Sequence, residues 1–243
     1  MTILFALLAV VQTADVPVVL LGNAASLKNG QHDYPSGVDF LAGALKETPG
    51  VRTAVVKDGW PSDPSVFDGA RCVVFYMDGG GKQPTADPGR LSVLEGLAAK
   101  GVGIVHLHQM VDYPKPVADR ARALLGGVWI KGAGARGHWD GDFRAFPDHP
   151  ITRGVSPFKE NDGYLYRISF VDGLHGVTPL LRTMPPKAAL QGTEDIVAWA
   201  YERPAGGRSF VFTGVHEHKL WSVDGLRRFT LNGILWAAGL LSN

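Results

Sequence analysis

Short apolar runs alternate with helical patterns through the first half of the chain. Four of these runs are uninterrupted and rich in valine, at residues 16–21, 52–56, 72–77 and 103–107. Such runs are typical of strands that are covered on both faces, as in a parallel sheet.

The segments between these runs predict helices. After Pro35, apolar residues follow the i, i+3, i+4, i+7 spacing of one buried helix face. For the next helix, Asp87 can cap the beginning, Pro88 suits the first turn and Gly101 can close the end. The repeated order of strand, helix and strand predicts an α/β fold with three layers, doubly wound around a mostly parallel sheet.

The second half of the chain is less regular. Residues 126–150 show no sustained period, so we expect an irregular excursion over the sheet. Further strands are expected at residues 178–183, 196–201 and 209–213, some of them antiparallel, and a closing helix at residues 222–240. Because no linker, repeat or charge block divides the chain, residues 16–243 are predicted to form a single domain.

The first residues allow two interpretations. Residues 3–11 form an apolar run as long as a signal-peptide core, and Gln12-Thr13-Ala14 offers a cleavage site. The run lacks a preceding Lys or Arg, which favours a first strand instead. Residues 1–15 are thus either an export leader, implying a periplasmic or exported protein, or part of a cytoplasmic one. No other apolar run approaches the ~20 residues of a membrane span.

Charge and cysteine content exclude several classes of function. Lys and Arg exceed Asp and Glu by only one, 24 against 23, so nucleic acid and anionic membranes are not expected partners. The single cysteine, Cys72, excludes internal disulfides and a four-cysteine zinc site. Residues 132–137 spell GxGxxG, but no helical period follows, so we expect no nucleotide cofactor.

Polar residues follow four predicted strands at their carboxyl ends, where ligands bind in open parallel sheets. His32 lies in the loop after the first strand, and Asp78 and Lys82 follow the third. The fourth strand leads into His108, and the strand at residues 209–213 leads into His216-Glu217-His218. The pattern predicts that these side chains share one edge of the sheet.

Each histidine also has a structural interpretation. His106 lies inside an apolar run and is expected in the core, whereas His108 at the turn is expected to be functional. His32 can instead cap the helix that follows it, and one histidine of residues 216–218 can cap a loop. His149 and His175 resemble turn residues.

Nine short segments, spread over nearly the whole chain from Val16, resemble the ThuA-like (trehalose-utilisation) family, a branch of the class I glutamine amidotransferase-like fold. They are GQHDY (30–34), FYMDGGG (75–81), GVGIVHLH (101–108), GHW (137–139), HPITRGV (149–155), VAWAYER (197–203), GGR (206–208), TGVHEH (213–218) and NGILWA (232–237).

The resemblance also marks two departures. The fold's amidotransferase members carry a catalytic cysteine on the turn after a central strand, where this chain has His108, so glutamine amidotransferase activity is not expected. The family usually has Glu directly after the Asp found here as Asp162, but this chain has Gly163. Glu160 is a candidate replacement.

The resemblance implies an enzyme of glycoside or disaccharide catabolism that acts on 3-keto-glycosides by elimination or hydration, as a lyase or hydrolase. One divalent metal, such as zinc, would bind three histidines and keep an open position. The expected partner is a small sugar or keto-sugar, and a homo-oligomer is compatible with the sequence. Two alternatives stay open: an enzyme without metal, and a carbohydrate-binding protein without turnover.

The candidate residues are His32, His108 and His216 for the metal; His108, His218 and Asp162 for catalysis; and Asp78, Lys82, His138, Trp139 and Trp221 for substrate binding.

Overall fold

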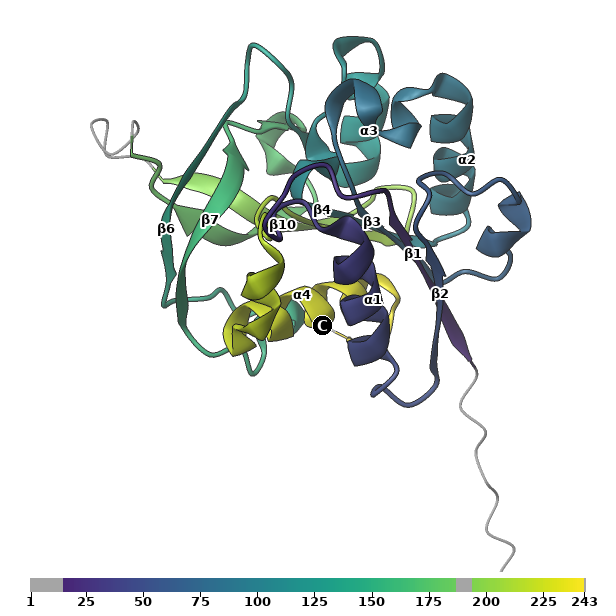
Figure 1. Ribbon diagram of the computed structural model, residues 1–243. Coiled ribbons are helices and arrows are strands. Elements are labelled where there is room, and N and C mark those ends of the chain that lie inside the picture. Colours follow the sequence, from purple (N-terminus) through teal and green to yellow (C-terminus); the bar gives the residue numbers. More distant parts are fainter. Residues whose placement is uncertain (1–14, 187–193, 243) are drawn as a thin grey trace, which may run out of the picture.

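The computed structural model describes residues 15–186 and 194–242, so the expected leader, apart from Asp15, lies outside the described residues. A seven-stranded sheet with the order β2-β1-β3-β4-β11-β10-β9 forms its centre (Figure 1). The first five of these strands are parallel, and β10 is antiparallel to both of its neighbours. The bounds are β1 Val16–Gly22, β2 Val51–Val56, β3 Cys72–Tyr76, β4 Gly103–Leu107, β9 Val177–Thr183, β10 Asp195–Glu202 and β11 Arg208–Phe212.

Helices cover both faces of this sheet. Figure 1 shows α1 (Tyr34–Leu45) and α4 (Asp224–Ala237) on one face, and α2 (Pro88–Ala99) and α3 (Lys115–Leu125) on the other. Successive residues of a strand point to opposite faces, and β1 accordingly contributes to two cores. Val18 and Leu20 pack on the α1/α4 side, while Val19 packs on the α2/α3 side. The predicted three-layer α/β fold is confirmed.

The ends of α2 follow the sequence signals. The Asp87 side chain accepts a hydrogen bond from the backbone amide of Arg90 at 2.9 Å, and Pro88 occupies the first turn.

Helix α3 was not among the expected elements, although it begins after Pro114 and ends at Gly126, whose φ is +76°. None of the helices in the described residues is long and apolar enough to cross a membrane.

The expectation of an irregular excursion at residues 126–150 is wrong. This segment contains β6 (Ala135–Phe143), which pairs antiparallel with β7 (Phe158–Tyr166). Trp139 and Phe143 are buried and His138 is exposed, so the strand does alternate, but glycines and aspartates hide its period from a hydropathy reading. A second small sheet joins β5 (Gly127–Val128) to β8 (Ser169–Phe170). The β6–β7 pair lies beside the β9 and β10 end of the central sheet (Figure 1).

Candidate functional site

Three histidines meet at the carboxyl edge of the central sheet. His32 follows β1, His108 follows β4 and His216 follows β11. One ring nitrogen from each lies within 4.8 Å of the other two, and all three residues are buried. The sheet topology produces this cluster, because parallel strands deliver the residues after them to one edge. We call these three residues the histidine triad.

Backbone hydrogen bonds join the first and last of these loops. The His32 amide donates to the His216 carbonyl oxygen at 3.0 Å, and the His218 amide donates to the Gly30 carbonyl oxygen at 2.8 Å. Gln31 and Glu217 form an antiparallel bridge between them. Loops that are far apart in the sequence are therefore held in register at the site.

The backbone of the triad is strained. His32 and His108 have φ values of +48° and +57°, and Val215, directly before His216, has a φ of +62°. The left-handed region is costly for side chains with a Cβ, and most of all for a β-branched residue such as valine. Such strain persists only where the surrounding structure fixes it, and it concentrates at functional sites.

A buried carboxylate fixes the tautomer of His32. Ser26 Oγ donates its only proton to Asp78 Oδ1 at 2.8 Å, so the His32 Nδ1–H donates to Ser26 Oγ at 2.9 Å. Burial opposes ionisation of Asp78, but hydrogen bonds from His32, Ser26 and Tyr34 outweigh it and lower the pKa of Asp78 to about 2. His32 Nε2 therefore carries a lone pair, and Asp78 supports this histidine from behind.

A backbone carbonyl fixes the tautomer of His108 in the same way. His108 Nδ1 lies 3.2 Å from the Thr213 carbonyl oxygen, which can only accept, so Nδ1 carries the proton and Nε2 the lone pair. His108 Nε2 lies 3.1 Å from His32 Nε2 and 3.2 Å from His216 Nδ1. Two acceptor nitrogens thus face each other without a proton between them.

Protonation of His108 does not relieve this contact at neutral pH. Burial, reinforced by the neighbouring histidines, lowers the pKa of His108 well below its usual range, and the same causes lower the pKa of His216 to about 4. From the sequence, His108 is expected at a strand end facing a helix start, and a helix N-terminus would also disfavour the imidazolium form. The element after β4 is a 3₁₀ helix of only four residues, His108–Val111, so burial is the main cause.

The cluster has the dimensions and support of a metal site. Two nitrogens bound tetrahedrally to zinc at 2.0–2.1 Å lie about 3.3 Å apart, close to the observed 3.1 and 3.2 Å. Metal-binding histidines usually donate their second N–H to a carboxylate, carbonyl or water, as His108 does to Thr213. Three imidazoles placed in this way can hold a divalent ion that polarises a substrate oxygen.

Asp162 positions the triad from β7. Its Oδ2 accepts from the Val215 amide at 2.6 Å, and its Oδ1 accepts from the amides of His216 at 2.9 Å and Gly163 at 2.7 Å. Burial raises the pKa of Asp162 to about 7, against the opposing effect of these three amides. The carboxyl group is fully buried and both oxygens are occupied, so the geometry assigns it to holding the strained turn before His216.

The glycine at position 163 makes room for His138. The two residues are cross-strand partners of β6 and β7, and a Cβ at Gly163 would lie 2.8 Å from His138 Nε2 and 3.0 Å from His216 Cγ. The rings of His138 and His216 lie 4.6 Å apart, and His138 is exposed. Glu160 is three residues from Gly163 on the strand and so points to the opposite face. His138 rather than Glu160 takes up the space.

The two tryptophans expected to bind a sugar ring are buried. Trp221 is 2% exposed, stacked on Phe40 and in edge contact with Tyr76, so it has no open face. Trp139 is 7% exposed, and its Nε1 donates to Thr183 Oγ1 at 3.0 Å. Packing in the α1/α4 core accounts for Trp221, whereas Trp139 packs in the same core and also lines a cavity beside β6.

The other candidates lie around the triad. Lys82 is exposed, with Nζ 3.7 Å from Asp78 Oδ2. His218 begins the 3₁₀ helix His218–Ser222, and its Nδ1 is buried without a hydrogen-bond partner in the described chain. His106 is a core residue, as predicted: it stacks on Phe75 at 5.0 Å and lies 3.2 Å from Tyr113 Oη.

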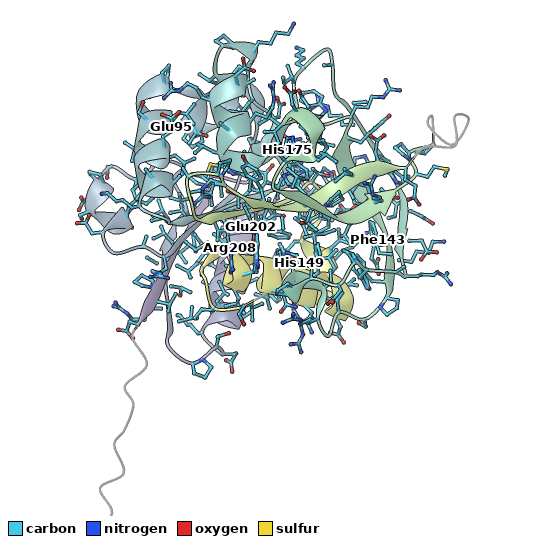
Figure 2. The ribbon with its side chains drawn as sticks, turned by 180° about the vertical axis from the view of Figure 1, so that it is seen from behind. Glu95, Phe143, His149, His175, Glu202 and Arg208 are labelled. Carbon is cyan, nitrogen blue, oxygen red and sulfur yellow. The ribbon has the colours of Figure 1, made fainter. Side chains whose placement is uncertain are left out.

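Two further histidines occupy turns, as their sequence contexts suggested. His149 Nδ1 accepts from the Ile151 amide at 3.2 Å, and His175 follows a short 3₁₀ helix at Asp172–Leu174. Figure 2 shows them on opposite sides of the central sheet, His149 beside Arg208 on the α4 side.

Replacing His106 by phenylalanine is expected to weaken the acid sensitivity of folding. Burial lowers the pKa of His106 to about 3, whereas the unfolded chain titrates near 6.5. Between these values only the unfolded state binds the proton, so His106 makes stability fall with falling pH, by about 1.4 kcal/mol per pH unit. His216 acts in the same sense and Asp162 in the opposite one. Urea unfolding of metal-free protein between about pH 6.5 and pH 4.5 measures the slope; equal slopes for both proteins would contradict the prediction.

Comparisons with known proteins agree with this architecture. The ThuA family, described as trehalose utilisation, matches residues 19–237. A ThuA-like protein from Parabacteroides merdae is similar in structure, with a TM-score of 0.65, 16% identity, and coverage of 95% of this chain and 92% of that one. A ThuA-like protein from Bacteroides uniformis gives a TM-score of 0.65 at 12% identity, covering 93% and 92%.

The wider fold is that of class I glutamine amidotransferases. The glutaminase domain of Trypanosoma brucei CTPS, solved with bound acivicin, has a TM-score of 0.50 at 9% identity and covers 94% of this chain and 95% of that one. None of the curated proteins matches the chain.

Proposed function

Because this chain belongs to the ThuA, or trehalose utilisation, family, we propose that it is an enzyme of glycoside catabolism that cleaves 3-keto-glycosides at a histidine-bound divalent metal. The observation that carries the proposal is the approach of two acceptor nitrogens, His32 Nε2 and His108 Nε2, to 3.1 Å in a buried site. A cation between them turns a repulsive contact into coordination.

His32, His108 and His216 would hold the metal through Nε2, Nε2 and Nδ1. When bound, the ion would supply Lewis acidity toward the ketone oxygen, which becomes negatively charged as the C2 proton leaves. Asp78 and the Thr213 carbonyl would keep the first two imidazoles in the required tautomer. Asp162 would keep His216 aimed at the site through its backbone amide.

His138 would transfer the proton. It is exposed, lies against His216, and is the histidine outside the triad that contacts it. A ketone at C3 acidifies the proton on C2, and His138 would accept that proton as a general base. The C2–H electron pair forms the C1=C2 bond, the C1–O bond breaks, and the resulting imidazolium returns the proton to the departing aglycone oxygen. Addition of water to the unsaturated keto-sugar completes the cleavage.

Turnover of a 3-keto-glucoside tests this function. His138→Gln is expected to lower kcat at least ~100-fold, the usual scale of general-base catalysis, while metal content stays that of the parent. His175→Gln, a change at an exposed histidine on another part of the surface, is the matched control and should keep full turnover. Thermal stabilisation of the parent protein by the keto-glucoside without any turnover would instead identify a carbohydrate-binding protein and overturn the proposal.

A further inference from the structure

A cavity of about 520 Å³ opens beside His138, along the free edge of β6. Its walls come from the segments around β5, β6 and β7 and include Trp129, Arg136, His138, Trp139, Tyr166 and Arg167. His138 lines the cavity and its ring also contacts the His216 ring, so this side chain links the cavity to the triad. It is a suitable size for a sugar-sized group.

The aromatic walls have no free polar atoms on their indoles. Trp129 Nε1 donates to the Ala135 carbonyl oxygen at 2.9 Å, and Trp139 Nε1 donates to Thr183 Oγ1 at 3.0 Å. The surfaces of these two indole rings that face the cavity are therefore apolar. Apolar walls displace water, and charges beside them interact more strongly than they do in bulk solvent.

Two arginines supply the polar groups of the cavity. The Arg136 guanidinium carbon lies 5.7 Å from the Trp129 ring centre, and that of Arg167 lies 5.9 Å from the Tyr166 ring centre. Stacking of this kind restrains a guanidinium while its N–H groups at the edge remain able to donate. Within the described residues, neither arginine forms an ion pair, in contrast to Arg52, Arg120, Arg122, Arg144 and Arg227.

Two carboxylates lie near these arginines, but within the described residues neither forms an ion pair with Arg136 or Arg167. Asp112 lies within electrostatic reach of Arg136 and Lys131, yet its own burial dominates and raises its pKa to about 6. Asp195 Oδ1 accepts from the backbone amide of Arg167 at 3.3 Å. That contact helps to hold Arg167 at a φ of +57°, an unfavourable conformation for a residue with a long side chain.

Arg136 lies on the same face of β6 as His138, the proposed general base. It lies two residues before His138 on β6, so both side chains leave the same side of the strand. Both side chains line the cavity, so a ligand bound there can contact Arg136 and His138 together. Planar arginine forks bind carboxylates and phosphates through paired hydrogen bonds, which a neutral sugar hydroxyl cannot match.

We infer that this cavity is a subsite for an anionic group, so that the preferred glycosides carry a carboxylate or a phosphate. The inference rests on the proposed function for the position of the reacting sugar, but it concerns binding alone. Arg136 and Arg167 would hold the anion, and the aromatic walls would pack against the ring that bears it.

Binding of unreactive glycosides tests the subsite without any need for turnover. Calorimetry should show methyl glucuronide or glucose 6-phosphate binding at least ~10-fold more tightly than methyl glucoside, and the two anions separate a carboxylate site from a phosphate site. Arg136→Gln and Arg167→Gln should each remove most of that preference while metal content is unchanged. Arg144→Gln, at an exposed arginine that follows β6 and pairs with Asp142, should leave it intact.

Equal binding of the neutral and anionic glycosides by the parent protein would overturn the subsite. So would an unchanged preference in both cavity variants. Either result leaves turnover of 3-keto-glycosides unaffected, whereas loss of the proposed function would appear as absent turnover with the anion preference retained.

Discussion

Replacing His108 by alanine is expected to abolish metal binding and to lower turnover of a 3-keto-glycoside by at least ~100-fold. His108 Nε2 lies 3.1 Å from His32 Nε2 and 3.2 Å from His216 Nδ1, so its loss leaves only two protein ligands, too few to retain the ion. The fold should survive, because the strain of a φ of +57° is already present with histidine and a repulsive contact is removed. Elemental analysis, steady-state kinetics and thermal unfolding measure the three effects.

His108→Gln separates the two roles that the sequence allowed for this residue. Loss of bound metal would identify a ligand, and retained metal with lost turnover would identify a base. His175→Gln again serves as the control. If His108→Ala keeps full activity but melts far below the parent, the histidine is structural and the site assignment fails.

Asp162→Ala is expected to lower the free energy of unfolding by about 3–5 kcal/mol. The substitution leaves three amides, those of Gly163, Val215 and His216, without their buried acceptor. The strained backbone at Val215 should then relax and turn His216 away, so metal affinity should fall as well. Chemical denaturation and competition with a chelator measure the two effects.

The matched control for this variant is Asp140→Ala. Asp140 lies on the neighbouring strand and also accepts a side-chain hydrogen bond, but it is exposed, so we expect a change below about 1 kcal/mol. Asp162→Asn, which keeps one acceptor oxygen, should fall between the two. Equal stabilities for Asp162→Ala and the parent would show that the carboxylate does not hold the turn.

The sequence predicted the central sheet because β1, β3 and β4 are short, largely apolar and buried runs bounded by turn residues. Because β1, β4 and β11 are parallel, the residues that follow them meet at one edge of the sheet. The proximity of His32, His108 and His216 was therefore predictable from the sheet topology alone. Helix α3 was also predictable from the sequence, since Val117, Ala121 and Leu124 follow a helical spacing between a proline and a glycine.

Other features depend on tertiary contacts and could not be predicted from the sequence. The pairing of β6 with β7 is hidden because glycine and aspartate replace the usual strand residues, and their partners lie many residues away. Trp221 was expected to bind a sugar ring because its indole offers a flat apolar face, but the turn at His218–Ser222 directs it into the core. The tautomers of His32 and His108 follow from Ser26 and Thr213, which no sequence pattern connects to these histidines.

The central claim is that the triad binds a divalent metal. Anomalous diffraction at the zinc edge, from crystals grown with zinc, tests it most directly. The structure predicts one strong peak about 2.1 Å from His32 Nε2, His108 Nε2 and His216 Nδ1, absent in His108→Ala. A map with zinc elsewhere on the protein and no peak between these three nitrogens would contradict the claim.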